Sequence, residues 1–428
     1  MVELKIKDNS FVNKADLKGI SRITESIANK TLEQLAKEGV FVFPECIQDA
    51  RDIVKGQMVL QRVNQQYQTS NVMGFLGYGK EKLVIESRFS TGEQDYFFQY
   101  LLEQALEFPN ILELNTNTNQ DTRLFKLFLF LFPNYLRAAM RKGVFKTYIR
   151  NQYNDNNLRG TIDIARHIRK NNPFVGKVAY NQREFSYDNY LMELIRHTIE
   201  FIKRKPYGNN LLRKVKDEME EVIKVTNSYE YYDRRKVLIT NKKNPIRHAY
   251  YHEYRNLQQL CIMILQQEEH QIGYGSQQIK GILFEGAWLW EEYLNTLLKE
   301  HFEHPMNKSG SGAHYYFEKS VGKIYPDFIA HDRSSICDAK YKKVENNQSR
   351  DFHQILGYMF RFHVNAGYLL YPGKGNRELI LKEHDDKVKV VKLGLAVPQV
   401  AKDYKEFEEQ MKMAEQEFTR RVLERFPE

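Results

Sequence analysis

Two short strand-like stretches in the C-terminal part of the chain decide its fold. The first reads KIYPDFI over residues 323–329, and the second reads SICDAKY over residues 335–341. β-Branched and aromatic residues are typical of strands, and the polar HDRS at residues 331–334 is typical of a turn. Because antiparallel strands run in opposite directions, a hairpin that closes at the middle of this turn places Asp327 directly opposite Asp338.

This pairing predicts a metal-dependent site. Two carboxylates that face each other across a ladder repel, so the pairing weakens the sheet unless a positive charge lies between them. A hard divalent cation such as Mg²⁺ or Mn²⁺ removes the conflict, and the main-chain carbonyl of Ala339 could be a further ligand. Strand alternation puts Lys340 on the same face as Asp338. There its ammonium can polarise water or stabilise charge on a scissile phosphate, so the residues indicate phosphodiester hydrolysis.

The stretches on either side of the hairpin favour a mixed α/β fold. Upstream, we expect a long helix over residues 280–300, whose apolar run carries several acids, one of which could supply another metal ligand. Downstream, Gln354 and Tyr358 lie four residues apart on one face of an expected helix, which leads to the apolar strand at residues 368–371.

The composition indicates a folded protein of two or three domains in a reducing compartment. Its 428 residues are 42% hydrophobic and 13% aromatic, which argues against disorder. Cys46, Cys261 and Cys337 form no CxxC pair, so neither a disulfide framework nor a zinc or iron–sulfur site is expected, and the cytoplasm fits best. We expect no signal peptide and no membrane span, since the most apolar run, residues 127–132, is far shorter than the roughly 20 residues needed.

Clustered cations between residues 137 and 183 suggest contact with DNA or with a partner. The formal net charge is +9, and this segment alone has eleven Lys or Arg against two acids, with aromatic residues interleaved. Cations and aromatics together suit a phosphate backbone, although a solvated basic face with core aromatics has the same pattern. The candidate contact residues are Arg137, Arg141, Lys142, Arg159, Arg166, Arg169 and Lys170.

The segment GFLGYGK at residues 74–80 fits the start of a phosphate-binding loop but lacks its chemistry. Glu81 follows it, where such a loop needs the hydroxyl of Ser or Thr to bind magnesium. The segment also leads into an alternating strand at residues 82–86 rather than into a helix, whose N-terminus would face the phosphates. We therefore expect this chain to bind no nucleotide itself.

Breaks in composition divide the chain into five expected segments. The sequence Gly-Tyr-Gly-Ser at residues 273–276 marks the clearest boundary, and an amphipathic helix is expected over residues 158–170. The segments are an N-terminal extension of open role (1–60), a mixed α/β domain (61–175), a helical region (176–272), a hydrolytic core (273–375) and a C-terminal strand and helix (376–428).

The motifs around the hairpin resemble the nuclease half of the McrC family. The resemblance covers residues 140–372 and rests on several motifs in the same order, which makes it far more specific than the acids and lysine alone. The motifs are residues 282–298, Pro326-Asp327, Asp338-Ala339-Lys340-Tyr341-Lys342, Gln354, Tyr358 and Leu369-Leu370-Tyr371-Pro372, with Leu158-Arg159-Gly160 and Glu184-Phe185-Ser186 upstream.

The resemblance implies a nuclease core of the PD-(D/E)xK type, in which a central mixed sheet is flanked by helices. It carries the metal-binding and catalytic roles over to Asp327, Asp338 and Lys340. The pair Trp290-Glu291 matches a Phe-Glu of the family, which implies that Glu291 is the acid supplied by the helix, with Glu285 in reserve. A Gln/Tyr pair of the family implies a supporting role for the residues at 354 and 358.

The family also implies partners. Its members work in restriction systems that defend against phage, together with an AAA+ GTPase of the McrB type whose hexamer recognises modified or specific DNA. The amino-terminal part of McrC-like subunits docks onto this hexamer and stimulates GTP hydrolysis, which implies docking by residues 61–175. Because residues 61–135 match only loosely, no GTPase-stimulating residue is carried over. A subgroup that reads a defined sequence, as in LlaJI-like systems, is also compatible.

Two other interpretations compete with the nuclease. A Pro-Asp followed by Asp-x-Lys arises by chance in roughly one soluble protein in five to ten, so the hairpin alone is also compatible with ion-paired Asp and Lys on a surface. In that case the chain would be a non-cleaving adaptor that binds DNA or the AAA+ ring and stimulates GTP hydrolysis. A Cas4-like exonuclease is disfavoured, because that branch generally needs four clustered cysteines.

Overall fold

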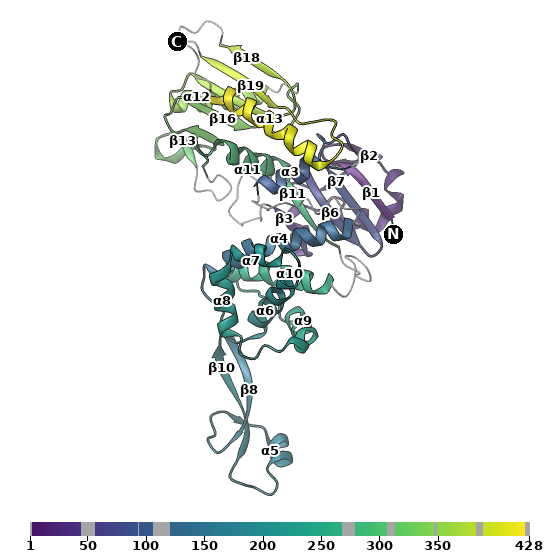
Figure 1. Ribbon diagram of the computed structural model, residues 1–428, viewed down its shortest axis with the longest axis vertical. Coiled ribbons are helices and arrows are strands. Elements are labelled where there is room, and N and C mark those ends of the chain that lie inside the picture. The colour runs from purple at the N-terminus through teal and green to yellow at the C-terminus, as the bar shows by residue number, and fades with distance from the viewer. Residues whose placement is uncertain are drawn as a thin grey trace. The chain divides into compact units, whose positions relative to one another are not determined.

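The chain folds as two units that differ in secondary structure (Figure 1). The computed structural model describes residues 2–43, 56–92, 94–105, 120–267, 279–305, 313–345, 349–381 and 388–423. The first unit contains residues 1–118 and 272–428, and the second contains residues 119–271. The boundary expected at residues 273–276 lies outside the described residues.

A five-stranded mixed sheet forms one part of the first unit. The strands follow the order β1, β7, β6, β11, β3. Strands β1 and β7 pair in parallel, as do β11 and β3, whereas β6 is antiparallel to both β7 and β11. The bounds are β1 (Val2–Lys7), β3 (Val40–Phe43), β6 (Val72–Tyr78), β7 (Glu81–Glu86) and β11 (Lys280–Glu285). The N-terminal residues are therefore built into this sheet, although the sequence suggested an extension.

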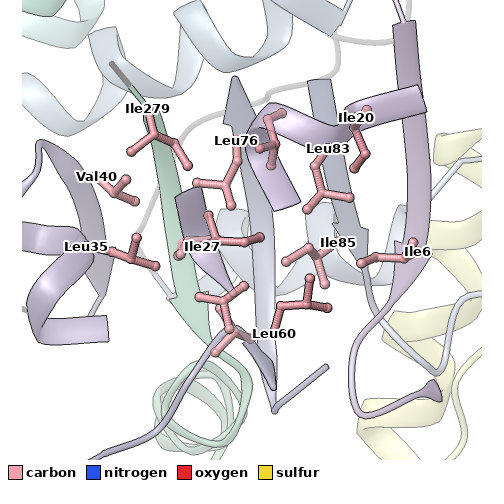
Figure 2. Packing of buried hydrophobic residues seen from close by; sticks show 14 of the residues in the cluster. Ile6, Ile20, Ile27, Leu35, Val40, Leu60, Leu76, Leu83, Ile85 and Ile279 are labelled. Carbon is pink, nitrogen blue, oxygen red and sulfur yellow. The ribbon is translucent and has the colours of Figure 1, made fainter. Parts of the chain in front are cut away.

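Apolar side chains on one face of this sheet form a core with two short helices (Figure 2). Leu76, Leu83 and Ile85 of the sheet pack in one cluster with Ile27 of α1 (Ser21–Ile27) and with Leu35 of α2 (Leu32–Lys37). A small antiparallel sheet in the order β2, β5, β4 adjoins this core. Its strands are β2 (Phe11–Asn13), β4 (Leu60–Val63) and β5 (Gln66–Thr69).

Strand β11 corrects the expectation of one long helix over residues 280–300. It lies between β6 and β3, so its Ile282, Leu283 and Phe284 are all fully buried. At Gly281 the neighbouring strand approaches so closely that a Cβ atom would lie 2.1 Å from the main-chain oxygen of Phe75. A short run of consecutive apolar residues fits a buried strand as well as a buried helix, which is why the pattern misled.

A six-stranded mixed sheet forms the other part of the first unit. Its order is β12, β15, β16, β17, β19, β18; β16, β17 and β19 are parallel neighbours, and the remaining pairs are antiparallel. The bounds are β12 (Phe302–Glu303), β15 (Phe328–Ala330), β16 (Ser335–Ala339), β17 (Ala366–Pro372), β18 (Asn376–Ile380) and β19 (Lys389–Leu395). A separate hairpin pairs β13 (His314–Phe317) with β14 (Val321–Ile324).

Helices flank this sheet, which confirms the expected mixed α/β architecture. Helix α12 packs on β16 and β17, where its Ile355 and Met359 share a cluster with Ile336 and Leu369. Helix α11 contacts β16, and α13 contacts β19, α11 and α3. The bounds are α3 (Tyr96–Ala105), α11 (Gly286–Leu298), α12 (Ser349–Phe362) and α13 (Tyr404–Leu423).

The second unit is a group of helices with a long β-ribbon. The ribbon consists of β8 (Thr147–Asp155) and β10 (Val178–Ser186), which pair antiparallel over their whole length, and α5 lies at its far end (Figure 1). Besides short 3-10 helices at Tyr231–Asp233 and Ala249–Tyr251, the unit contains α4 (Gln120–Met140), β9 (Thr161–Ile162), α5 (Ile164–Lys170), α6 (Tyr190–Lys203), α7 (Gly208–Arg213), α8 (Lys216–Val225), α9 (Arg234–Lys243) and α10 (His252–Gln267). The helix expected over residues 158–170 begins only at Ile164, because Asp163 accepts a hydrogen bond from the Arg166 amide and caps it.

One of the expected segments does not correspond to either unit. The segment 61–175 is divided between them, since β6 and β7 pair with strands of the first unit while β8 pairs within the second. Within the part of the chain that the structure describes, no helix has the length and apolar character needed to span a bilayer.

Candidate active site

The hairpin of β15 and β16 has the predicted register. Phe328 pairs with Cys337 and Ile329 pairs with Ile336, as expected for closure at the middle of the turn. Asp327 directly precedes β15, and its carboxylate accepts a hydrogen bond of 2.8 Å from the main-chain N–H of Ala339. This bond holds the Asp327 carboxylate at the open end of the hairpin, beside the strand that carries Asp338.

Asp338 is a buried acid whose pKa lies well above the ordinary value of an aspartate. Its side chain lies on the face of β16 that α12 covers, and the residue is 1% exposed. Burial raises the pKa of Asp338 to about 7; the nearby Lys340 charge opposes this rise and the Asp327 charge adds to it. Near neutral pH the carboxyl group is therefore close to its protonation midpoint, and a cation that binds it must displace the proton below that pH.

Lys340 contacts the same acid, as strand alternation predicted. Its ammonium forms an ion pair with Asp338 and donates a hydrogen bond of 3.0 Å to the side-chain oxygen of Gln354. Burial alone would lower the pKa of Lys340, but the charge and hydrogen bond of Asp338, together with the charges of Asp327 and Asp351, outweigh burial and raise it. The side chain therefore presents a positive charge inside the site at neutral pH.

Hydrogen bonds of Gln354, which Tyr358 supports, connect α12 to Asp338 and Lys340. The Gln354 side-chain nitrogen donates to Asp338 Oδ1 at 3.4 Å and to the Tyr358 hydroxyl at 2.8 Å. The Tyr358 hydroxyl in turn donates to the main-chain oxygen of Tyr325 at 3.0 Å. The predicted neighbours on one helical face therefore form a chain of hydrogen bonds that fixes the acid and the lysine relative to the loop before Asp327.

The two acids proposed for the upstream helix have different surroundings. Glu285 precedes α11 and caps it, since its carboxylate accepts hydrogen bonds from the amides of Ala287 at 3.2 Å and Trp288 at 2.7 Å. Glu291 lies within α11 and is buried. The fully buried neighbour Trp290 donates its indole N–H to the main-chain oxygen of Leu370 at 3.2 Å, which anchors the helix against β17. The helix geometry therefore favours Glu291 over Glu285.

His304 is a residue of this site that the sequence did not reveal. Its Nδ1 donates to the main-chain oxygen of Asp327 at 2.8 Å, and its Nε2 lies 3.7 Å from Glu291 Oε1. Burial would lower the pKa of His304, but hydrogen bonds to Glu292 and to the Asp327 oxygen outweigh it and raise the pKa to about 9. The imidazolium therefore links the helix acid to the hairpin. Its partners are far apart in the chain, so no local spacing pointed to it.

All of the candidate site residues in the first unit line one pocket of about 740 Å³. The predicted members are Glu285, Glu291, Asp327, Asp338, Ala339, Lys340, Gln354 and Tyr358. Apart from Ala287 and Tyr325, the rest of the lining comes from the N-terminal residues, chiefly from the loops and strands around β4 and β5. No sequence pattern predicted this second contribution, because those residues carry no charge and form no motif.

The donor set fits a divalent cation. Carboxylates and a main-chain carbonyl are the oxygen ligands that Mg²⁺ and Mn²⁺ prefer. Asp338 Oδ2 is buried and accepts no hydrogen bond of ordinary geometry from the described residues, although Lys340 neutralises it. Among the described side chains, no three of His, Cys, Asp or Glu already stand close enough together to hold a metal ion. A cation at Asp338 would therefore require the Lys340 ammonium to move away from Oδ2.

The basic candidates all lie in the second unit, and three of them have partners there. Arg166 is buried and donates to the main-chain oxygen of Tyr180 at 2.5 Å, which corrects its expected role as a surface contact. Lys142 pairs with Glu253 at 2.6 Å, and Arg137 lies 3.6 Å from Glu218. The others are exposed: Arg141, Arg159, Arg169 and Lys170.

The chain is similar to known components of a restriction system. A family model described as McrBC 5-methylcytosine restriction system component matches residues 67–372. No curated protein matches the chain. A refined half-complex of Thermococcus gammatolerans McrB AAA+ hexamers with bound McrC contains a chain that is 16% identical, with a TM-score of 0.48, over 96% of this chain and 100% of that one. The cryo-EM structure of the Thermococcus gammatolerans McrBC complex contains a chain that is 15% identical, with a TM-score of 0.30, over 70% of this chain and 87% of that one.

Proposed function

The chain belongs to the family of McrBC 5-methylcytosine restriction system components, and from this premise we propose that it is the subunit that cuts DNA. It would be a metal-dependent endodeoxyribonuclease of the PD-(D/E)xK type that acts in the cytoplasm with an AAA+ GTPase of the McrB type. The observation that carries this proposal is the buried Asp338 beside Asp327, with Lys340 on the same acid, in a pocket large enough for a nucleotide.

Different residues of the pocket would bind the metal ion, stabilise the phosphate and position these groups. Asp327, Asp338 and Glu291 would hold Mg²⁺ or Mn²⁺, with the carbonyl of Ala339 as a further ligand. A bound ion of this kind supplies a Lewis acid for the phosphate and lowers the pKa of water. Lys340 keeps its proton and can donate hydrogen bonds to a phosphate oxygen as negative charge develops on it. The side-chain oxygen of Gln354 accepts a hydrogen bond from Lys340, and its side-chain nitrogen donates one to Asp338. A single amide therefore keeps both residues in position.

The reconstituted reaction tests this function directly. With its AAA+ partner, GTP, Mg²⁺ and the DNA that the partner recognises, the chain is expected to cut both strands. A chelator of divalent ions should stop the cutting, and excess Mg²⁺ should restore it, because the acids alone cannot activate water. Cutting is measured from the length of the DNA on a gel, and GTP hydrolysis is measured from the phosphate that is released. Stimulated GTP hydrolysis with intact DNA would instead support the adaptor.

We also propose that the end of the β-ribbon in the second unit is the part that docks onto the AAA+ partner. The chain between β8 and β10 exposes several large apolar side chains, of which Ile164 is 69% and Phe174 is 65% exposed. Ile168 and Val175 extend this exposed set. Gathered apolar side chains on a surface mark protein–protein contacts, and the exposed Arg169 beside them suits a polar rim.

Changing two of these apolar side chains tests the docking role. The double substitution Ile168→Ser and Phe174→Ser is expected to weaken binding of the partner and to lower its stimulated GTPase rate at least about tenfold, since exposed anchors carry most of the energy of an interface. Tyr232→Ser is the control, because Tyr232 is 91% exposed in the same unit but belongs to the turn before α9 and not to the segment between β8 and β10. Equal partner affinity of the double variant and the control, measured by light scattering or titration calorimetry, would refute the assignment.

A further inference from the structure

The lining of the candidate active-site pocket includes a wall without charged groups. Besides the acids and Lys340, the pocket is lined by Asn9, Gln57, Gln61, Gln68, Thr69 and Asn71. These residues come from the N-terminal part of the first unit, whereas the acids and the lysine come from residues 285–340. The pocket is therefore shared between a charged, reactive side and a neutral side rich in amides.

The small sheet of β2, β5 and β4 holds this wall in place. Leu60 and Tyr67 point into the core beneath the five-stranded sheet, where Leu60 packs close to Ile27 and Ile85 (Figure 2). Because successive side chains of a strand alternate between faces, the neighbours Gln61 and Gln68 point the other way. The wall is thus attached to a rigid core rather than to a loose segment.

Three side chains form one row across the outer face of this sheet. Gln68 pairs with Gln61 on one side and with Phe11 on the other. Residues directly opposite in antiparallel strands share a face and lie within contact distance. Phe11 is 61% exposed, so a solvent-exposed aromatic ring lies next to the two amides at the end of the row.

The amides of this row have unused hydrogen-bonding capacity. Neither Gln61 nor Gln68 has a side-chain hydrogen bond with any residue that the structure describes, whereas Gln66 on the same sheet donates to Asn13 at 2.9 Å. A neutral amide offers a donor and an acceptor but no charge, so it suits the edge of a nucleobase better than a phosphate. An exposed aromatic ring offers a surface on which a base or its methyl group can rest.

We propose that the row of Phe11, Gln68 and Gln61 contacts the bases next to the phosphate that the acids would cleave. This inference rests on the proposed nuclease function, since it assigns a second side to the same pocket. DNA bound with a phosphate at Asp338 and Lys340 must place its neighbouring bases beside the backbone. Gln61 and Gln68 line the pocket that contains those two residues, Phe11 lies next to Gln68 on the same sheet, and the described residues on this side of the pocket include no Lys or Arg. The N-terminal residues would then help to position the strand that is cut.

Binding of DNA by the full chain tests the wall without requiring cleavage. The substitution Phe11→Ala and the pair Gln61→Ala with Gln68→Ala are made in an Asp338→Asn background, and a fluorescent duplex is titrated by anisotropy at several salt concentrations. Each variant is expected to bind about tenfold more weakly, within the range for loss of a base–aromatic contact. The slope of log affinity against log salt should not change, because no cation that faces a phosphate has been removed.

Gln65→Ala is the matched control, because Gln65 is an exposed amide in the turn between β4 and β5 and does not line the pocket. A duplex with abasic sites around the cleavage position provides the second control. The Asp338→Asn protein should bind this duplex with the same affinity with or without the wall substitutions, since the bases that the wall contacts are absent. A merely structural effect of the substitutions would weaken binding to both duplexes, and melting temperatures would fall.

The outcomes separate this inference from the function on which it rests. If the wall variants bind intact DNA as tightly as the Gln65→Ala control, or if the unaltered chain binds no DNA, the inference is overturned. If the salt slope falls with the affinity, the wall acts on phosphates and the inference is also overturned. Continued cutting by Asp338→Asn would instead reject the assigned nuclease site, whatever the anisotropy shows.

Discussion

Asp338→Asn should lower the rate of DNA cleavage by about 10³-fold, the size of loss that follows removal of one strong electrostatic contact in a transition state. Asparagine has nearly the volume of aspartate and can still accept the hydrogen bond from Gln354, so the pocket should keep its shape. It cannot carry the negative charge that a divalent cation requires. The rate is measured on DNA with the assembled AAA+ complex under GTP and Mg²⁺.

The same preparations separate catalysis from assembly. Complex formation and stimulated GTP hydrolysis should remain at the level of the unaltered chain, because the change is confined to the pocket. Asp332→Asn is the control: this acid lies in the turn of the same hairpin, is exposed, and accepts hydrogen bonds from Ser334. It should cut normally. Cutting by Asp338→Asn at the control rate would contradict the assignment of Asp338.

Lys340→Met is expected to lower kcat by about 10²-fold with little change in KM, since the ammonium acts on charge that develops during the reaction. Methionine keeps most of the apolar stem and removes the charge. The charge of Lys340 also lowers the pKa of Asp338. Without it the carboxyl group should hold its proton to higher pH, so the acid limb of the cleavage profile should shift toward alkaline pH.

The pH profile distinguishes this role from a structural one. A variant that was only unstable would lose activity at every pH without a shift of the acid limb. Lys343→Met is the control, because Lys343 is exposed three residues further along the same segment. A loss confined to KM, with an unchanged pH profile, would mean that Lys340 only binds DNA.

Local patterns were enough to predict the structure of the hairpin formed by β15 and β16. Its register depends on a turn of four polar residues, and the positions of Asp338 and Lys340 on one face depend only on the alternation of strands. The contact between Gln354 and Tyr358 likewise follows from helical spacing within one element. Each of these predictions needed information from no more than about a dozen consecutive residues.

The rest of the pocket depends on contacts that no local pattern encodes. Strand β11 was mistaken for helix because its partners, β6 and β3, lie more than 200 residues earlier in the chain. His304 acquires its role from Glu291 and Asp327, which belong to different elements. Arg166 reads as a surface cation, yet its guanidinium is used to bind main-chain oxygens inside the second unit. In all three cases, contacts between residues from different elements determined the structure.

The position of β11 limits how this chain can be divided. Residues 119–271 interrupt the first unit as an insertion between the early strands and β11. A fragment that started after this insertion would carry β11 and the acids but would lack β3 and β6, leaving both edges of a strand with a fully buried apolar centre unpaired. The part of the chain that follows the insertion is therefore not an autonomous module, and gene fusions or truncations that respect the fold must retain the strands on both sides of the insertion.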